Sequence, residues 1–286
     1  MQVNSKSSLF SGFLALTVLG GCATVSSLSV RHETAARIAA SAGMHERVVH
    51  AGIFNLTTWQ RIEKSSAPVD LYIEGDGLAW LGKYTKSPNP TPPDPVALRL
   101  AAEDPAPNVI YMARPCQYTG WNESGPCLDI YWTSGVTAPE VIAAYNQALD
   151  GIRKDYNVTG FNLVGYSGGA AIAMLVAARR HDVLSIRTVV GNTDYAAFVA
   201  IHNVSPLKDS IDPTSVASEI AGIPQRHFIG GKDSVVPQDV FDGWKRASGT
   251  YFCMHETVVV GNSHEKGWAR KWPSLLRIPV FCNSVP

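Results

Sequence analysis

The sequence lacks the short motifs that hold metals and nucleotides in most proteins that use them. It contains no Cys-x-x-Cys pair and no His-Glu-x-x-His, so the usual spacings of zinc ligands are absent. The stretch "GGKDS" fails as a phosphate loop, because Arg226 stands at the first glycine position and Asp233 replaces the hydroxyl residue after lysine. "GDGLAWLG" fails as a dinucleotide motif, since Trp80 occupies the third glycine position. The sequence therefore implies no metal and no organic cofactor.

An excess of either charge is also absent. The chain has 24 Lys and Arg against 24 Asp and Glu, which gives a formal net charge of +0 over 286 residues. Proteins that bind nucleic acid need a basic excess to neutralise phosphates. We therefore expect no nucleic-acid partner.

Apolar runs long enough to span a bilayer are missing, and the first short run stands near the N-terminus. "MQVNSKSS" carries a single cation, and "LFSGFLALTVLGG" at 9–21 follows it directly. This run is too short to span a bilayer as a helix, and its layout is typical of a secretory signal peptide.

A cysteine follows this apolar run at once. The stretch "LGGC", ending at Cys22, resembles the lipobox of bacterial lipoproteins, in which the cysteine is lipidated and becomes the mature N-terminus. The resemblance implies a signal peptide over 1–21 and a lipidated N-terminus with a tether over 22–45. Ala23 stands where aspartate would favour the inner membrane, so the outer membrane facing the periplasm is expected. The alternatives are a plain signal peptide cleaved further along, or an N-terminal anchor helix.

The chain has few cysteines, and export would change how they are interpreted. Beyond the first, four remain: Cys116, Cys127, Cys253 and Cys282. An even number in an oxidising compartment suggests two disulfides. We favour Cys116 with Cys127, closing the polar loop "CQYTGWNESGPC", and Cys253 with Cys282, attaching the C-terminal tail. The other two connectivities, and four reduced cysteines acting as small buried residues, are the alternatives.

Apolar, β-branched runs alternate with longer helical patterns through most of the chain. Strands are expected at "VDLYIEG" from 69, "NVIYMAR" from 108, "FNLVGYS" from 161, "IRTVVGN" from 186, "RHFIGGKD" from 226 and "ETVVVGNSH" from 256. Helices are expected at about 95–103, 139–155, 168–180, 235–247 and 265–276. The strands show no polar alternation, so both of their faces are buried, and the alternation with helices predicts a mostly parallel sheet with helices on both faces.

One hydroxyl stands where the third expected strand turns into a helix. Gly165, Ser167 and Gly169 in "GYSGG" match G-x-S-x-G, a turn so tight that its flanking positions favour glycine. In a parallel sheet the ligand crevice lies at the carboxyl ends of the strands. This position favours a nucleophilic serine over a surface one.

From these residues the chain resembles the α/β-hydrolase superfamily over about 46–276. The resemblance is carried by "GYSGG" at 165, "GGKDSVVP" at 230 and "GNSH" at 261, in the order serine, acid, histidine that this fold uses. It implies an α/β-hydrolase domain over 46–286, with a small cap over 195–222. It also implies a serine hydrolase that cleaves an ester or related acyl bond.

The base and the acid can be assigned from strand polarity. His264 lies just past the strand "TVVVG", at the same edge of the sheet as Ser167, so it is the expected base. Asp233 follows the strand "RHFIGG" in a compact loop and is the expected acid. The competing acid is Asp194 in "GNTDY", because some members of the superfamily place the acid after that strand.

Acyl transfer also needs donors for the oxyanion of the tetrahedral intermediate. The Gly168 amide, at a helix N-terminus, is the first expected donor. The loop "EGDGLAW" resembles the His-Gly-x-Gly oxyanion loop, with Glu74 in place of histidine. This resemblance implies the Asp76 amide as the second donor, with Gly77 as the alternative. A plain turn is the other interpretation of the loop.

The expected protein is thus a lipid-anchored serine hydrolase of the cell envelope, with a small-molecule or lipid ester as substrate and the membrane as partner. Esterases, lipases, thioesterases and peptidases share these groups. Four aromatic residues could line an acyl pocket or belong to the core: Trp80, Tyr118, Trp121 and Trp132. The alternative function is an envelope binding or scaffold lipoprotein that keeps the fold without turnover.

Overall fold

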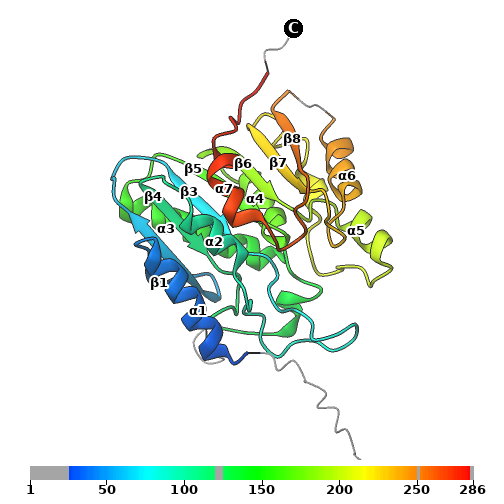
Figure 1. The fold of residues 1–286 in the computed structure, drawn as a ribbon, viewed down its shortest axis with the longest axis horizontal. Coiled ribbons are helices and arrows are strands. Elements are labelled where there is room, and N and C mark those ends of the chain that lie inside the picture. Colours follow the sequence, from blue (N-terminus) through cyan, green and yellow to red (C-terminus); the bar gives the residue numbers. More distant parts are fainter. Residues whose placement is uncertain (1–25, 120–124, 250–251, 284–286) are drawn as a thin grey trace, which may run out of the picture.

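A single eight-stranded sheet forms the centre of the protein (Figure 1). The computed structural model describes residues 26–119, 125–249 and 252–283. The strands stand in the order β1-β2-β4-β3-β5-β6-β7-β8. Their bounds are β1 (His45–Ala51), β2 (Phe54–Ile62), β3 (Val69–Ile73), β4 (Asn108–Met112), β5 (Phe161–Tyr166), β6 (Val183–Val189), β7 (Gln225–Gly230) and β8 (Met254–Val259).

The sheet is parallel over most of its width. Neighbouring strands from β4 through β3, β5, β6 and β7 to β8 pair in parallel, whereas β1 and β2 pair antiparallel with each other, and β2 pairs antiparallel with β4. The six strands expected from the sequence are these parallel ones. Their carboxyl ends therefore meet at one edge of the sheet.

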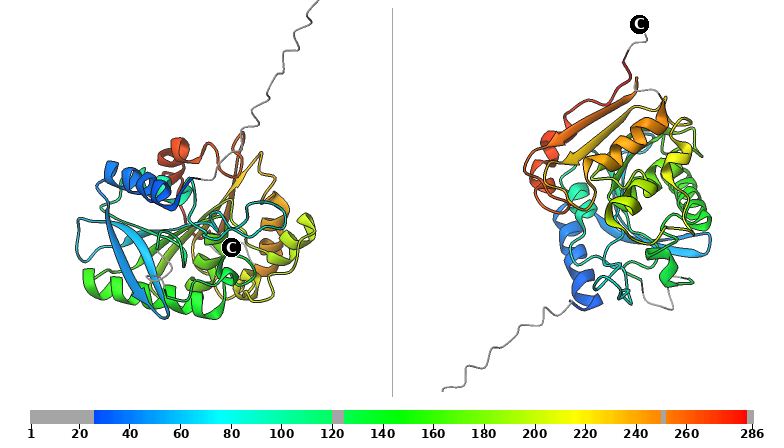
Figure 2. Two further views of the ribbon diagram at one scale, coloured as in Figure 1. Left: turned by 90° about the horizontal axis from the view of Figure 1, so that it is seen from below. Right: turned by 90° about the vertical axis from the view of Figure 1, so that its right-hand side faces the viewer.

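Helices cover both faces of the sheet (Figure 2). The helices α3, α4 and α6 pack on one face, and α1, α2 and α7 pack on the other. The helices are α1 (Leu28–Ser41), α2 (Val96–Ala102), α3 (Pro139–Tyr156), α4 (Gly168–Ala177), α5 (Tyr195–His202), α6 (Gln238–Ser248) and α7 (Trp268–Leu276). The five helices expected from the sequence are confirmed, and each face has its own apolar core.

The strands β1 and β2 are not among those that the sequence predicts. β1 lies at the edge of the sheet, and most of its side chains are exposed and polar. In β2, polar residues interrupt the apolar pattern yet are buried, because they find partners; Gln60 Nε2 donates to Thr58 Oγ1 at 2.8 Å. Polar side chains can be buried when they are hydrogen-bonded, so the sequence of such a strand shows no apolar pattern.

Helix α1 lies within the segment expected as a tether. Ser27 caps it by accepting a hydrogen bond from the Val30 amide, and Ala35 and Ala39 are buried in the same core as α2. Met44 is buried there too. The packed part of the chain therefore begins well before residue 46, and any tether after Cys22 is shorter than expected.

The disulfide pairing matches the expectation. Cys116 is bonded to Cys127, and Cys253, just before β8, is bonded to Cys282 in the C-terminal tail. Cys22 and the expected signal peptide lie outside the described residues. Among the described helices, none has both the length and the apolar character needed to cross a bilayer.

Candidate active site

Ser167 stands on a sharp turn between β5 and α4. Its backbone adopts φ 50° and ψ −121°, a conformation that L-residues rarely take. The turn closes tightly: a Cβ at Gly165 would lie 2.4 Å from the Ala170 Cα, and one at Gly169 would lie 2.3 Å from the Ile73 carbonyl oxygen. Both glycines are required by this close approach, and the turn lifts the serine side chain above the end of the strand.

Three side chains that are far apart in the sequence form one chain of hydrogen bonds. The Ser167 Oγ lies 2.9 Å from the His264 Nε2, and the His264 Nδ1 lies 2.9 Å from the Asp233 Oδ2. The Asp233 carboxylate is fully buried, and the imidazole is 14% exposed. This geometry lets the hydroxyl donate to one ring nitrogen while the other ring nitrogen donates to the carboxylate.

The Asp233 carboxylate is held in place from its other side. Its Oδ1 accepts hydrogen bonds from the amides of Val235 at 2.8 Å and Val236 at 3.0 Å. The remaining oxygen, Oδ2, is thereby turned toward His264. The acid is therefore oriented before any substrate arrives.

The loop that carries His264 is fastened by two aromatic residues. The indole N–H of Trp268 donates to the carbonyls of Ser263 at 2.8 Å and His264 at 3.1 Å. The Tyr166 hydroxyl donates to the His264 carbonyl at 3.2 Å. No motif in the sequence marks these two positioning residues, although Tyr166 directly precedes the serine and Trp268 begins the helix after the histidine.

Asp194, the competing acid, is the N-cap residue of α5. Its Oδ1 accepts a hydrogen bond from the Ala197 amide at 2.8 Å and caps α5. Its Oδ2 packs so closely on α6 that a Cβ at Gly243 would lie 1.8 Å from it. The structure thus places Asp233 beside His264 and leaves Asp194 in a helix cap.

The loop after β3 lies against the serine. A Cβ at Gly75 would come within 3.2 Å of the Ser167 Cβ, and the Asp76 carboxylate lies directly over Gly168. Arg114, which is buried, donates to the Asp76 Oδ1 at 2.8 Å and also to the Val136 carbonyl. Within the described part of the chain, the Asp76 amide donates no hydrogen bond of its own. It is therefore available to a bound ligand.

Solved structures that are similar to this chain include several hydrolases. An esterase from Pyrococcus furiosus matches with a TM-score of 0.60 at 12% identity, over 83% of this chain and 91% of that one. An alpha-beta serine hydrolase homologue from Coxiella burnetii matches with a TM-score of 0.54 at 14% identity, over 81% and 93%. The fold is that of the α/β-hydrolases.

A peptidase shares the α/β-hydrolase fold with this chain as well. The acylaminoacyl peptidase of Pyrococcus horikoshii matches with a TM-score of 0.56 at 11% identity, over 80% of this chain and 39% of that larger one. No protein-family model and no curated protein matches the sequence. At such low identity the neighbours establish the fold, and the chemistry has to be argued from the side chains.

Glu74 stands at the start of the loop after β3, from which an oxyanion donor is expected, and its side chain turns inward. It is fully buried, and its Oε1 accepts hydrogen bonds from the amides of Gly75 at 2.9 Å and Ala97 at 3.3 Å. Burial raises the pKa of Glu74 to about 7, against the opposing effect of these two hydrogen bonds. The carboxyl group therefore ties the loop to the N-terminal end of α2.

The aromatic residues considered for an acyl pocket have different surroundings in the structure. Tyr118 packs edge-on against Trp59 in the core beneath α1 and α2, and Trp132 is buried beside the Cys116 disulfide. Trp80 is 46% exposed, and Trp121 lies outside the described residues. Tyr118 and Trp132 therefore belong to buried clusters.

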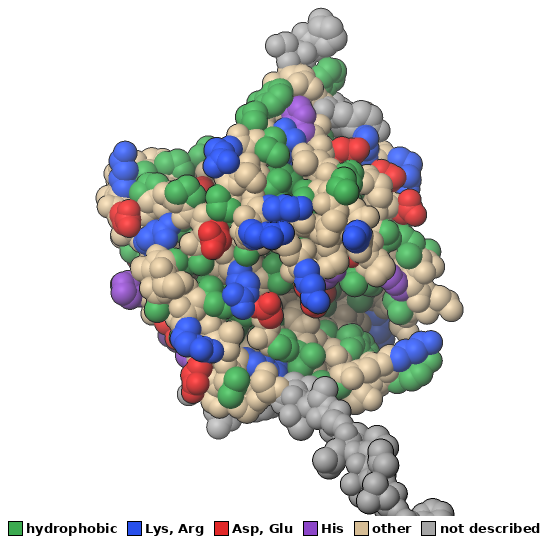
Figure 3. Space-filling model, viewed as in Figure 1, with side chains coloured by type: hydrophobic (Ala, Val, Ile, Leu, Met, Phe, Trp, Pro, Cys, Tyr) green, Lys and Arg blue, Asp and Glu red, His purple; other side chains and the backbone are tan. Residues whose placement is uncertain are grey.

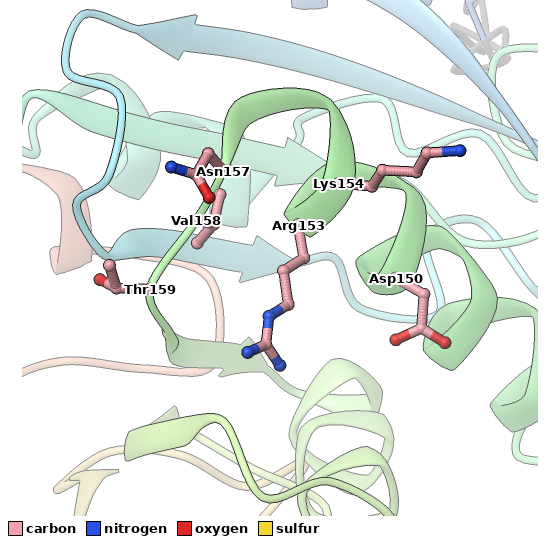
Figure 4. Close-up of a pocket in the computed structure, with 6 residues that line it drawn as sticks. All are labelled: Asp150, Arg153, Lys154, Asn157, Val158 and Thr159. Atoms are coloured by element: carbon pink, nitrogen blue, oxygen red, sulfur yellow. The ribbon is translucent and has the colours of Figure 1, made fainter.

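A cavity of about 600 Å³ lies at the other edge of the sheet, beside the end of α3 (Figure 4). Its lining residues are Asp150, Arg153, Lys154, Asn157, Val158 and Thr159. Thr159 precedes β5, whereas Ser167 follows it, so the length of the strand separates this cavity from the serine. Arg153 pairs with Asp182 at 2.9 Å, which joins α3 to the start of β6. We interpret this cavity as a structural feature of the α3 end.

Proposed function

We propose that this chain is a serine hydrolase that cleaves an ester or a related acyl bond through an acyl-enzyme. The observation that carries the proposal is the continuous hydrogen-bonded chain from Ser167 through His264 to Asp233, on a strained turn at the carboxyl ends of the strands. A serine hydroxyl is a weak nucleophile until a neighbouring base takes its proton. Here the base and its orienting carboxylate are already in position.

The first half of the proposed reaction acylates the serine. The Ser167 Oγ attacks the substrate carbonyl carbon, and its proton passes to the His264 Nε2. The carbonyl oxygen becomes an oxyanion, which accepts hydrogen bonds from the amides of Gly168 and Asp76. When the intermediate collapses, the bond to the leaving group breaks, and the leaving group takes the proton from His264.

The second half releases the acyl group. A water molecule gives a proton to His264 as its oxygen attacks the acyl carbon, and the bond to the Ser167 Oγ then breaks. The serine recovers its proton from the imidazole. Asp233 accepts the hydrogen bond from the His264 Nδ1 throughout and holds the imidazole in orientation.

An ester is the bond class that the neighbours favour, since one is an esterase, while the peptidase among them makes an amide a second candidate. A panel of p-nitrophenyl esters of graded chain length, with aminoacyl amides alongside, would separate these classes. A fluorophosphonate probe should label the wild-type protein and fail to label Ser167→Ala. An unlabelled wild-type protein would instead support the non-catalytic scaffold.

We also propose that the chain is lipidated at Cys22 and attached to the outer membrane on its periplasmic side. The proposal rests on the short apolar run and the "LGGC" stretch. Two disulfides are in keeping with an oxidising compartment.

A further inference from the structure

The oxyanion loop continues directly into an exposed β-hairpin, which we call hairpin 78–90. At its base, the Leu78 amide donates to the Pro90 carbonyl at 3.0 Å. Further out, the Ser87 amide donates to the Ala79 carbonyl at 2.9 Å, and the Leu81 amide donates to the Thr85 carbonyl at 2.8 Å. The hairpin is therefore an ordered arm that starts one residue after Gly77.

The outer part of hairpin 78–90 exposes large apolar and aromatic side chains. Trp80 is 46% exposed, Leu81 47% and Tyr84 82%. Leu128, which directly precedes the Asp129 partner of Lys86, is 58% exposed. Apolar groups of this size usually belong to a core, so their exposure together on one arm marks an interaction surface.

The charges on this arm favour a particular partner. Lys83 lies over the Tyr84 ring, 5.3 Å from its centroid, and Lys86 lies 2.8 Å from Asp129. Hairpin 78–90 itself contains no acidic residue. Segments rich in tryptophan, tyrosine, leucine and lysine bind at the interface of an anionic bilayer. In Figure 3, basic and apolar side chains stand together at the lower right, where the hairpin ends, and the surface is hollowed beside them.

The N-terminal end of the described chain is fastened to the base of the same hairpin. Arg31 on α1 donates through Nε to the Ser26 carbonyl at 2.8 Å and through Nη1 to the Thr91 carbonyl at 2.8 Å. The start of α1 and hairpin 78–90 lie at the same end of the molecule in two views (Figures 1 and 2).

The distance from this point to the proposed lipid is short. Cys22 and Ser26 are four positions apart, and even a fully extended chain spans at most about 14 Å over four residues. A lipid on Cys22 would therefore hold this end of the molecule, and no other, against the membrane.

We propose that hairpin 78–90 docks into the surface of the anionic bilayer to which the chain is anchored, with Trp80, Leu81 and Tyr84 at the lipid interface. This inference rests on the lipidation at Cys22 put forward under the proposed function. Because the hairpin grows out of the oxyanion loop, docking also places the Ser167 site close to the bilayer. Esters carried by the membrane are therefore the substrate class that this arrangement favours.

The test uses the lipidated full chain in vesicles of three parts phosphatidylethanolamine to one part phosphatidylglycerol, with acyl chains either plain or brominated. Bromine quenches tryptophan only at close range, so docking predicts that brominated lipid lowers the emission attributable to Trp80 by at least twofold. Trp80→Phe should remove this quenched component.

A tryptophan at the opposite edge of the sheet supplies the matched control. Phe252, just before β8, is 43% exposed, so Phe252→Trp in the Trp80→Phe background should show no such quenching. Equal Trp80 emission in plain and brominated vesicles would overturn the docking, as would quenching at position 252 equal to that at Trp80. A chain without an acyl group on Cys22 would also overturn the inference.

Fluorophosphonate labelling in the same vesicles separates this inference from the proposed chemistry. Labelling of Ser167 without quenching of Trp80 would support the proposed hydrolase and contradict the docking. Quenching of Trp80 without labelling of Ser167 would support the docking and contradict the proposed hydrolase.

Discussion

At the scale of single residues, Ser167 and His264 act as one unit in the proposed reaction, because proton transfer between them accompanies attack. Ser167→Ala and His264→Ala should therefore each abolish turnover of a p-nitrophenyl ester to a similar degree. Asp233→Asn keeps the shape but weakens the orientation of the imidazole, so we expect a smaller loss, of about one or two powers of ten. Steady-state kinetics on purified variants would measure these losses.

Asp194→Asn is the matched control for the acid. Its side chain caps α5, so this variant should keep its kcat. Full activity in Asp233→Asn, together with a loss in Asp194→Asn, would reverse the assignment.

Glu74 should make stability depend on pH. Its pKa is about 7 in the folded chain and 4.5 as an ordinary glutamate, so folding favours the protonated form. The resulting stabilisation is complete below pH 4.5 and is lost as pH rises through 7, a change of about 3 kcal/mol. Glu74→Gln cannot ionise and should reduce this slope in chemical unfolding between pH 4.5 and 7.

Asp70 contributes a slope in the same direction, because burial, with Asp104 nearby, raises its pKa to about 7 as well. Part of the pH dependence should therefore survive in Glu74→Gln. Glu219→Gln, at an exposed position, is the control and should leave the slope unchanged. An identical slope in Glu74→Gln and wild type would show that Glu74 does not titrate in this way.

The sequence predicts the positions of the catalytic candidates better than it predicts what supports them. Ser167, Asp233 and His264 each follow a strand, and strand ends of a parallel sheet meet at one edge, so the pattern alone brings them together. The contact of Arg114 with Asp76 depends on how the segment after β4 folds back, and no local pattern records that path. The inward turn of Glu74 is likewise decided by tertiary packing.

At the scale of elements, the Cys253–Cys282 bridge closes the segment that carries His264. Its sequence separation is 29, against 11 for Cys116–Cys127. Chain entropy then predicts about 3.6 kcal/mol for the longer loop and about 2.8 kcal/mol for the shorter one. Cys282→Ser should therefore lower the melting temperature and the activity more than Cys127→Ser does.

Cys253→Ser should match Cys282→Ser, because both break the same bridge. Peptide mapping under non-reducing conditions would identify the pairs in protein taken from the envelope. Cys116 linked to Cys253 or Cys282, or four free thiols, would refute the pairing and the stability argument.

Elements with a clear apolar pattern can be predicted from the sequence, and those without one cannot. The inner strands β3, β4, β5 and β7 read as apolar runs because nearly all of their side chains are buried. β1 carries polar residues on an exposed edge, and the buried residues of α1 are two alanines and Arg31, with Ile38 packed beside them, so neither element has a strong apolar signal.

At the scale of the whole molecule, the proposed lipid on Cys22 would decide where the protein resides. Cys22→Ala removes the only atom that the lipid could be attached to, so labelled palmitate should no longer be incorporated and the signal peptide should remain uncleaved. Metabolic labelling followed by gel electrophoresis would measure both effects. Incorporation that persists in this variant would exclude lipidation at this residue.

The backbone of Ser167 has a consequence for the folding stability of the entire chain. A non-glycine residue at φ 50° and ψ −121° costs about 1–3 kcal/mol, against a total of about 5–15 kcal/mol for a typical domain. Ser167→Gly relieves this strain at a cost of about 0.5–1 kcal/mol in unfolded-chain entropy, so it should melt above Ser167→Ala. Thermal unfolding of the two inactive variants would show it, and equal or reversed melting temperatures would contradict it. If Ser167 is the nucleophile proposed above, selection for stability alone would favour glycine at this turn, and selection for activity would oppose it.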